Sequence, residues 1–446
     1  MFIKLALILL FLVSQSPAGC DKNVKAMPQT QTRGQGIENG KEIKTIEKAQ
    51  KEVIKYPKSA KSYFKLALVY LQDNMSEKAV ETLNKTLKID PDYIDAWILL
   101  AQIDMLKKDY RSAKEKCSKA LLINPDHPMV HAVLGNIWIE LKDVDKAIKY
   151  LQKAIELDSS LVSVHYNLAN LYQAQGKKDL SLKEYQEIIR LEPKNTDIRI
   201  KKAIIYTEQL DYTSAMNELN TCLEINPTNF VAHDLIGIIS LRKGDVEQAI
   251  ACFSKSIKIN PNFYIGYEHL GDVYGTQRKY QQAIKHYQEA LKINSGLILV
   301  HYKLGTLFEN QKMYEKAIEE YRVVISMNPN FVAAYNNLAY LLAEQGVDLK
   351  KALEFALKAN ELAPDKLEIL DTLGWVYYHN KKYQDAVVLL EKAAKLATDN
   401  PFILYHLGRS YDKVEKKDDA KRTLKKVMEI SPDFEKKQEI LKILND

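Results

Sequence analysis

The chain has 446 residues, of which 46% are hydrophobic and 27% are charged, and both fractions are ordinary for a soluble protein. Its formal net charge is only +6, and lysine pairs recur at predicted turns between helices instead of clustering on one face, which argues against a nucleic-acid-binding protein. No H-E-x-x-H, C-x-x-C, glycine-rich phosphate loop or G-x-S-x-G motif is present. We therefore expect no metal, no cofactor, no small-molecule substrate and no catalytic residues.

Residues 1–20 are predicted to be a targeting segment. Lys4 gives a basic start, and Leu5–Val13 is an uninterrupted apolar run. This run is too short to span a bilayer, which takes about 20 residues, but it is typical of a secretory signal. The Ala-Gly-Cys sequence that follows resembles the cleavage box of bacterial lipoproteins, which implies that Cys20 is acylated and anchors the chain in a membrane. Because Pro17 stands where that box usually has an aliphatic residue, a soluble secreted or periplasmic protein is the alternative.

Two short segments separate this leader from the rest of the chain. Residues 21–41 are polar and rich in Gly and Gln, without a helical period, and are predicted to form a flexible tether. Residues 42–59 contain an amphipathic helix, Glu42–Tyr56, whose apolar residues recur at helical spacing. Because this helix ends at Pro57, in phase with the marks described next, we expect it to cap the N-terminal end of an array.

Proline, or Ser or Thr in its place, recurs along the chain at eight consecutive steps of 34 residues, then one step of 35 and two more of 34. A period of this size indicates stacked helical hairpins, each contacting mainly its neighbours. Because the period is unbroken, we expect one continuous array whose surface serves to bind partners. The marks are Pro57, Pro91, Pro125, Ser159, Pro193, Pro227, Pro261, Ser295, Pro329, Pro364, Thr398 and Pro432.

The residues between the marks resemble the tetratricopeptide pattern W-x2-L-G-x2-Y…A-x3-F…P, as Tyr267, Leu270, Gly271, Tyr274 and Ala283 illustrate. Each unit has a small residue where the first helix of the hairpin (helix A) is expected to approach the second (helix B), and a larger side chain there would overpack the hairpin. These small residues are Ala67, Ala101, Gly135, Ala169, Ala203, Gly237, Gly271, Gly305, Ala339, Gly374 and Gly408.

The resemblance covers residues 60–434, which divide into eleven repeats, and leaves residues 435–446 as a C-terminal capping helix. It implies an all-α fold, in which antiparallel helix pairs stack into a right-handed superhelical α-solenoid. Terminal caps with one polar side are what such arrays need to stay soluble.

In this family, helix A residues that are not needed for packing line a concave groove in which partner proteins bind. Residues three or four apart share a helix face, and counting from the packing positions gives a stripe that is apolar in the N-terminal repeats and aromatic and polar in the C-terminal ones. The apolar part suggests a hydrophobic or helical peptide as ligand, unless residues 42–56 cover part of it. The expected groove residues are Phe64, Leu68, Ile98, Asn136, Tyr166, Asn170, Tyr302, Asn336, Tyr340, Asp371, Trp375, Tyr378, Tyr405 and Arg409.

Trp375 is the strongest single candidate for partner binding, because Trp, Tyr and Arg dominate interface hot spots. Its neighbour Gly374 fills the packing slot and Tyr377 is expected to face inward, so Trp375 has no evident packing role in its own repeat. The alternative is that Trp375 packs against the next repeat.

The histidines and cysteines have structural explanations. Packing explains the histidines that share one helix A slot, and burial explains cysteines at inward positions of helix B. One pair of cysteines in successive helix Bs could form a disulfide in an oxidising compartment, although sequence does not fix the distance between them. The histidines are His131, His165, His233 and His301, the inward cysteines are Cys117 and Cys222, and the pair is Cys222 and Cys252.

The stretch Leu370–Tyr378 resembles bacterial tetratricopeptide lipoproteins linked to exopolysaccharide export and type IV pilus assembly. The resemblance implies a non-catalytic protein–protein interaction scaffold, anchored in the cell envelope and facing the periplasm, that assembles a membrane or export machine. Since the chain ends soon after the last repeat, we expect no catalytic domain and no enzyme activity. Two alternatives stay open: a chaperone-like holder of exported client proteins, and a periplasmic module that binds glycan through its Asn and Tyr rows.

Overall fold

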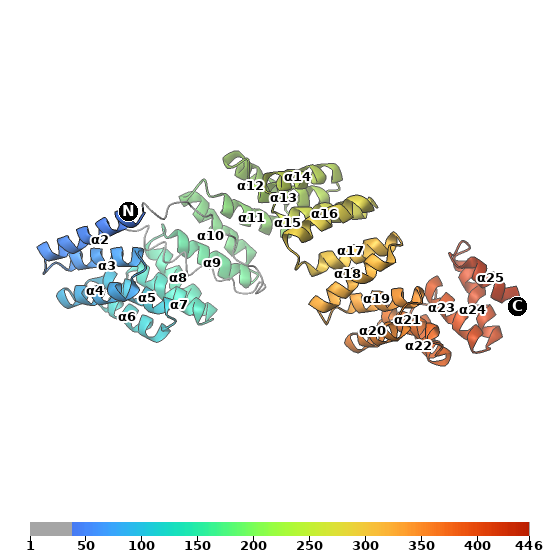
Figure 1. Ribbon diagram of the computed structural model, residues 1–446. Coiled ribbons are helices and arrows are strands. Elements are labelled where there is room, and N and C mark those ends of the chain that lie inside the picture. Colours follow the sequence, from blue (N-terminus) through green and yellow to red (C-terminus); the bar gives the residue numbers. More distant parts are fainter. Residues whose placement is uncertain (1–37, 446) are drawn as a thin grey trace. The chain divides into compact units, whose positions relative to one another are not determined.

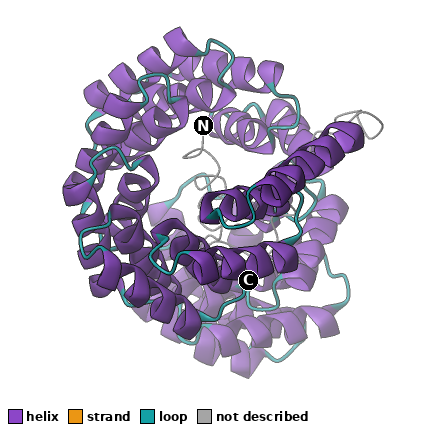
Figure 2. Ribbon diagram, turned by 90° about the vertical axis from the view of Figure 1, so that its left-hand side faces the viewer, coloured by secondary structure: helices purple, strands orange, loops and turns teal. Residues whose placement is uncertain are grey.

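The computed structural model describes residues 38–445, with side chains from residue 45 onward. In this part of the chain every regular element is a helix and none is a strand (Figure 1, Figure 2). The chain divides into two compact units. The first, which we call unit 1, ends at Pro227, and the second, which we call unit 2, begins at Thr228. The constant period had favoured one continuous array, but a period does not exclude such a division, because each repeat contacts mainly its neighbours.

Unit 1 begins with a lone helix, α2 (Glu38–Lys55), which packs on the first of five helical hairpins. These hairpins are α3 (Ala60–Gln72) with α4 (Ser76–Ile89), α5 (Ile94–Leu106) with α6 (Tyr110–Ile123), α7 (Pro128–Glu140) with α8 (Val144–Leu157), α9 (Val162–Ala174) with α10 (Lys178–Leu191), and α11 (Thr196–Glu208) with α12 (Tyr212–Ile225).

Unit 2 contains six hairpins and ends with a short helix, α25 (Lys437–Asn445). The hairpins are α13 (Phe230–Arg242) with α14 (Val246–Ile259), α15 (Tyr264–Thr276) with α16 (Tyr280–Ile293), α17 (Ile298–Asn310) with α18 (Tyr314–Met327), α19 (Val332–Glu344) with α20 (Leu349–Leu362), α21 (Leu367–His379) with α22 (Tyr383–Leu396), and α23 (Pro401–Lys413) with α24 (Lys417–Ile430).

The two terminal helices have slightly different ends from those predicted, since α2 ends at Lys55 and α25 begins at Lys437. α2 begins at Glu38, so residues 38–41 belong to this helix and not to the expected tether. An apolar pattern marks only the residues that pack, and it does not fix where an exposed helix end begins. The expected signal segment 1–20, with Cys20, and the remainder of the tether lie outside the described residues.

A left-handed residue closes each hairpin turn. After α3, Asn74 has φ 58°, its N–H bonds Leu71 O, and the N–H of Met75 bonds Tyr70 O at 2.7 Å. This pair of bonds is the Schellman motif, which satisfies carbonyls at a helix end. The extra residue of the 35-residue repeat lies in such a turn, because residues 345–348 separate α19 from α20 whereas only residues 73–75 separate α3 from α4.

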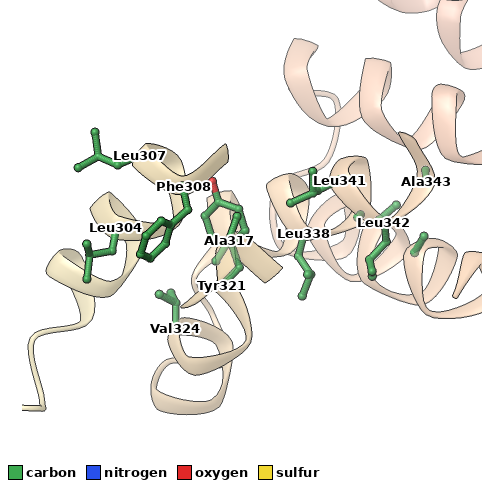
Figure 3. Close-up of a cluster of buried hydrophobic side chains, with 14 of the residues drawn as sticks. Leu304, Leu307, Phe308, Ala317, Tyr321, Val324, Leu338, Leu341, Leu342 and Ala343 are labelled. Carbon is green, nitrogen blue, oxygen red and sulfur yellow. The ribbon is translucent and has the colours of Figure 1, made fainter. Parts of the chain in front are cut away.

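The small residue of helix A faces a large side chain of helix B that lies sixteen positions further along the chain. A Cβ added to Gly271 would lie 2.4 Å from the ring of Tyr287, and one added to Gly305 would lie 2.6 Å from the ring of Tyr321. Figure 3 shows the hydrophobic surroundings of Tyr321, with Phe308 and Ala317 near its ring. The same pairing recurs at Gly135–Leu151, Gly237–Phe253, Gly374–Leu390 and Gly408–Leu424.

The helix A slot assigned to packing histidines also holds a hydrogen bond. His131 Nε2 lies 2.9 Å from the carbonyl oxygen of Pro125, six residues earlier, and Trp97 Nε1 donates to Pro91 O at 2.9 Å. The residue at this position therefore links the start of helix A, by a side-chain hydrogen bond, to the backbone carbonyl of the preceding proline of the 34-residue series. The same bond is made by His165 to Ser159, Arg199 to Pro193 and His301 to Ser295.

The three described cysteines, Cys117, Cys222 and Cys252, are buried free thiols. Burial raises the pKa of Cys117 to about 12 and that of Cys222 to about 11. These thiols therefore stay protonated and unreactive near neutral pH. Among the described helices, none combines the length and the apolar character needed to cross a bilayer.

The Gly271–Tyr287 contact makes a prediction about stability. We expect Gly271→Ala to destabilise the fold by about 1–3 kcal/mol, because the new methyl group displaces the Tyr287 ring. Gly275→Ala is the matched control in the same helix, since a Cβ added to Gly275 would meet nothing within 4 Å, and it should stabilise the helix by about 0.8–1 kcal/mol. Urea-unfolding midpoints followed by circular dichroism test both variants, and equal midpoints would contradict the close-contact argument.

Candidate functional site

The candidate binding surface is the face of helix A that points away from helix B. The fourteen residues predicted to lie there all belong to helix A, but none of them is fully exposed. Half-buried positions are Phe64, Leu68, Tyr166, Asn170, Tyr302, Asn336, Tyr340, Asp371 and Arg409. Buried positions are Ile98, Asn136, Trp375, Tyr378 and Tyr405.

Trp375 is enclosed by its own chain. Its side chain is 4% exposed, its Nε1 donates to Glu344 at 3.0 Å, and its indole stacks on Tyr378 and His406 at centroid distances of 4.7 and 4.1 Å. The expectation that Trp375 has no packing role is therefore corrected, and the alternative of packing against the next repeat holds. The indole is the largest side chain at a point where α19, α21 and α23 meet. It is buried because it fills the space between these helices.

In unit 2, polar residues of helix A bond to the helix A of the neighbouring repeat. Lys303 Nζ lies 3.0 Å from Glu268 Oε1 and 2.9 Å from Asp272 Oδ2, and His269 Nδ1 lies 2.9 Å from Asp234 Oδ1. The series continues with Asn337 to Tyr302, His406 to Asp371 and Arg409 to Tyr378. Tyr302, Asp371, Tyr378 and Arg409 are thus engaged within the unit, whereas Oδ1 of Asn336 is buried without a hydrogen-bond partner.

These contacts shift the pKa values of His269 and Lys303. Burial lowers the pKa of His269, but the hydrogen bond to Asp234 together with the negative charges of Asp234, Asp272 and Glu268 raises that pKa above its ordinary value. Burial likewise lowers the pKa of Lys303, and the two carboxylates of Glu268 and Asp272 raise it further than burial lowers it. Lys303 and its two carboxylate partners therefore form an ion pair between repeats in a partly buried environment.

The C-terminal segment takes part in the same face of unit 2. Lys436 Nζ reaches Glu344 Oε1 at 2.9 Å, across 92 residues of chain. Burial raises the pKa of Glu344, but its bonds to Lys436 and Trp375 outweigh burial and lower that pKa. Glu439 on α25 accepts from Tyr405 at 2.8 Å and also pairs with Arg409. No sequence pattern indicated these contacts, because a repeat period carries no information about partners three repeats apart.

The helix A face of unit 1 is different, because much of it is apolar. Phe64, Leu68 and Leu71 on α3 are half-buried and pack at the edge of a cluster that includes Leu99 and Ile103 of α5. Their outer sides remain accessible. We call these three residues the α3 apolar face. They offer a hydrophobic surface without an internal polar network.

Gln102 on α5 is the exception in this apolar environment. Its side chain is 3% exposed, and neither Nε2 nor Oε1 has a hydrogen-bond partner. A buried polar group without a partner costs about 1–3 kcal/mol. Gln102 is not among the predicted groove residues, because the lack of a partner becomes visible only in three dimensions.

The chemical groups on this face interact with one another and form no reactive cluster among the described residues. Within residues 45–445, no group of three or more His, Cys, Asp or Glu side chains is placed to hold a metal ion.

The enclosure of Trp375 makes a second prediction. We expect Trp375→Ala to lower the stability of unit 2 by about 3–5 kcal/mol, because it leaves a cavity between stacked rings and removes one of the hydrogen bonds to Glu344. Val388→Ala on the neighbouring α22 is the control, since Val388 is exposed and its truncation should change stability by no more than about 0.5 kcal/mol. Thermal unfolding followed by circular dichroism compares the two, and an unchanged transition in Trp375→Ala would show that the indole is not a packing residue.

Solved structures with a similar fold include YrrB, a tetratricopeptide protein with an unusual peptide-binding site, which is 20% identical with TM-score 0.39 and is matched over 42% of this chain and 95% of its own. A tetratricopeptide repeat protein from Parabacteroides merdae is 20% identical with TM-score 0.43, over 55% of this chain and 97% of its own. The C-terminal part of a repeat protein from Cytophaga hutchinsonii is 19% identical with TM-score 0.44, over 54% and 99%. No curated protein matches the chain significantly.

Family models match most of the repeats. The model described as TPR repeat matches residues 135–176 and 310–346. Models described as tetratricopeptide repeat match residues 70–137, 162–195, 232–263, 264–297 and 377–438. Together these matches cover more than half of the chain, and the chain belongs to the tetratricopeptide repeat family.

Proposed function

We propose that this protein is a non-catalytic scaffold that is anchored in the bacterial cell envelope and binds segments of partner proteins to assemble a membrane or export machine. Tetratricopeptide arrays are typically interaction scaffolds. The observation that carries the proposal is the contrast between the two units. The polar residues of helix A in unit 2 bond to each other, whereas the α3 apolar face of unit 1 keeps accessible hydrophobic side chains.

The partner segment binds to unit 1 in this proposal. Phe64 stacks on Tyr93 at a centroid distance of 5.0 Å, so the α3 apolar face extends to the start of α5 as a continuous aromatic and aliphatic surface. Burial of such a surface contributes roughly 25 cal/mol per Å². An apolar segment of a partner is therefore the ligand that gains most from this surface.

The envelope location rests on the sequence of residues 1–20. The apolar run Leu5–Val13 followed by Ala-Gly-Cys supports export and acylation of Cys20. An acyl anchor on this cysteine would hold the array at a membrane while leaving both units free to bind. A chaperone-like holder of exported clients would use the same apolar surface, and the breadth of partners distinguishes the two functions.

Photocrosslinking in cells tests the scaffold. A photoreactive residue at Leu68, in the α3 apolar face, is expected to capture one or two recurrent envelope proteins, identified by mass spectrometry. Leu122 on α6 is the control, because it is 85% exposed and lies on helix B of the next repeat. A broad set of unrelated exported proteins from position 68 would favour the holder, and identical adducts from both positions would contradict binding at the α3 apolar face.

Fractionation tests the anchor separately. We expect Cys20→Ser to release the full chain from washed membranes into the soluble fraction, because the acylated thiol is lost. Cys117→Ser should stay with the membrane, since Cys117 is a buried free thiol of α6. Retention of the Cys20→Ser protein in the membrane pellet would show that another feature anchors the chain.

A further inference from the structure

Two histidines occupy the same helix A position in different units, His165 on α9 of unit 1 and His301 on α17 of unit 2. Each lies between a backbone carbonyl and a carboxylate of helix B, and we call this arrangement a clamp. We propose that the two clamps are pH-sensitive and join helix A to helix B in one hairpin of each unit only while the imidazole is protonated. This inference goes beyond the proposed scaffold function and does not depend on it.

The first argument is that both ring nitrogens of His165 face an acceptor. Its Nδ1 lies 2.6 Å from Glu184 Oε2, and its Nε2 lies 3.2 Å from the carbonyl oxygen of Ser159. The ring is only 3% exposed. A neutral imidazole carries one N–H and donates to only one acceptor, whereas an imidazolium donates to both. The complete clamp therefore requires the protonated ring.

His301 repeats this arrangement in unit 2. Its Nδ1 lies 2.6 Å from Glu320 Oε2, and its Nε2 lies 3.3 Å from the carbonyl oxygen of Ser295. The hydrogen bond to Glu320 raises the pKa of His301 further than burial lowers it. Glu320 belongs to α18, and α16, which also packs on α17, contributes no ion pair to this histidine within the described residues. The charge that acts on the ring is thus negative.

The second argument comes from Arg199 on α11, where a permanent cation occupies the same position. Its Nη1 donates to Glu218 at 2.8 Å, and its Nη2 donates to the carbonyl oxygen of Pro193 at 3.2 Å. The carboxylate again lies nineteen residues after the cation, and the carbonyl lies six residues before it. Because arginine stays protonated in proteins, this hairpin keeps its two bonds at any pH. The position therefore accommodates a cation that donates in both directions.

The surroundings of His165 favour the charged ring. Burial lowers the pKa of His165. The hydrogen bonds to Glu184 and Ser159 act in the opposite direction, as do the negative charges of Glu184 and Glu187, and together they place that pKa above its ordinary value. Both carboxylates belong to α10. The other helix that packs on α9, α8, contributes no ion pair to His165 among the residues that the structure describes.

A histidine whose pKa is raised in the folded state makes stability depend on pH. Its stabilisation is fully present below the unfolded-state pKa of about 6.5 and is lost as the pH rises through the higher folded-state value. An increase from about pH 6 to about pH 8.5 thus weakens the contacts of α9 with α10 and of α17 with α18. Since the stability of a repeat array depends on the interfaces between neighbours, the effect extends to the adjoining repeats.

NMR titration of the full chain, with isotopically labelled histidine rings, tests the clamps directly. We expect the signals of His165 and His301, assigned with His165→Gln and His301→Gln, to titrate above the ordinary histidine pKa of about 6.5. In Glu184→Gln the pKa of His165 should fall by about 1 or more, because the opposite charge beside the imidazolium is lost. Titration of either histidine at or below the ordinary value in the unaltered chain overturns the proposal for that clamp.

Urea unfolding followed by circular dichroism, at about pH 6 and about pH 8.5, tests the consequence for stability. We expect a lower midpoint at the higher pH, and a smaller difference between the two midpoints in both Glu184→Gln and His165→Arg. The arginine variant should lose pH dependence because its side chain stays charged at both pH values.

The matched control is His131→Gln on α7, which should keep the full difference between the two midpoints. His131 makes the same bond to a carbonyl, but its Nδ1 has no hydrogen-bond partner. An unchanged difference in Glu184→Gln and His165→Arg overturns the clamp of unit 1. Should Glu184→Gln fail to fold, the titration of the unaltered chain still decides between the two outcomes.

Discussion

The close approach of helix A to helix B is the contact on which the other features of each unit are built. A Gly or Ala on helix A leaves room for a Leu, Phe or Tyr sixteen residues later on helix B, and at Gly135, Gly271 and Gly408 a single added carbon would lie within 2.6 Å of that side chain. Because the contact recurs from hairpin to hairpin, all described helices A share one length and all helices B another. The repeated hairpin then has the same two outer faces each time, and differences between repeats are confined to those faces.

Function depends on how the helix A face is used in each unit. In unit 2 the polar side chains of one repeat bond to the next, as Lys303 does to Glu268 and His406 does to Asp371. Such hydrogen bonds link neighbouring repeats of unit 2 and engage these polar groups within the chain. Unit 1 has fewer of these links on α3 and α5, and the side chains that stay accessible on α3 are apolar. The polar groups of unit 2 are bonded within the chain, whereas unit 1 has groups without such partners. This division suits a scaffold, because a partner gains most binding free energy from groups that have no contacts within the chain.

Trp375 illustrates why residue type does not identify a binding residue. A tryptophan on the helix A face has the composition of an interface hot spot, but the same large ring is also the best filler of a space between helices. The indole stacks on Tyr378 and His406 and bonds Glu344, so the chain itself provides the aromatic and polar contacts that a partner would have supplied. Gln102 shows the opposite case, in which an inconspicuous residue stands out because its two polar atoms have no partner.

The repeat, the helix pairs, the close contacts and the turns could all be predicted from the amino-acid sequence, because each of these depends on residues within one period of 34 residues. The burial of Ala67 and Ala101 and that of Cys117 and Cys222 follow from that local pattern. Which helix A residues are enclosed and which stay accessible became clear only in three dimensions. Lys436 bonds to Glu344 across 92 residues, and such a contact depends on how several repeats stack, each adding a small rotation to the last. The 34-residue period determines on which face of its helix a side chain lies, but the stacking of successive repeats determines which residues that side chain contacts.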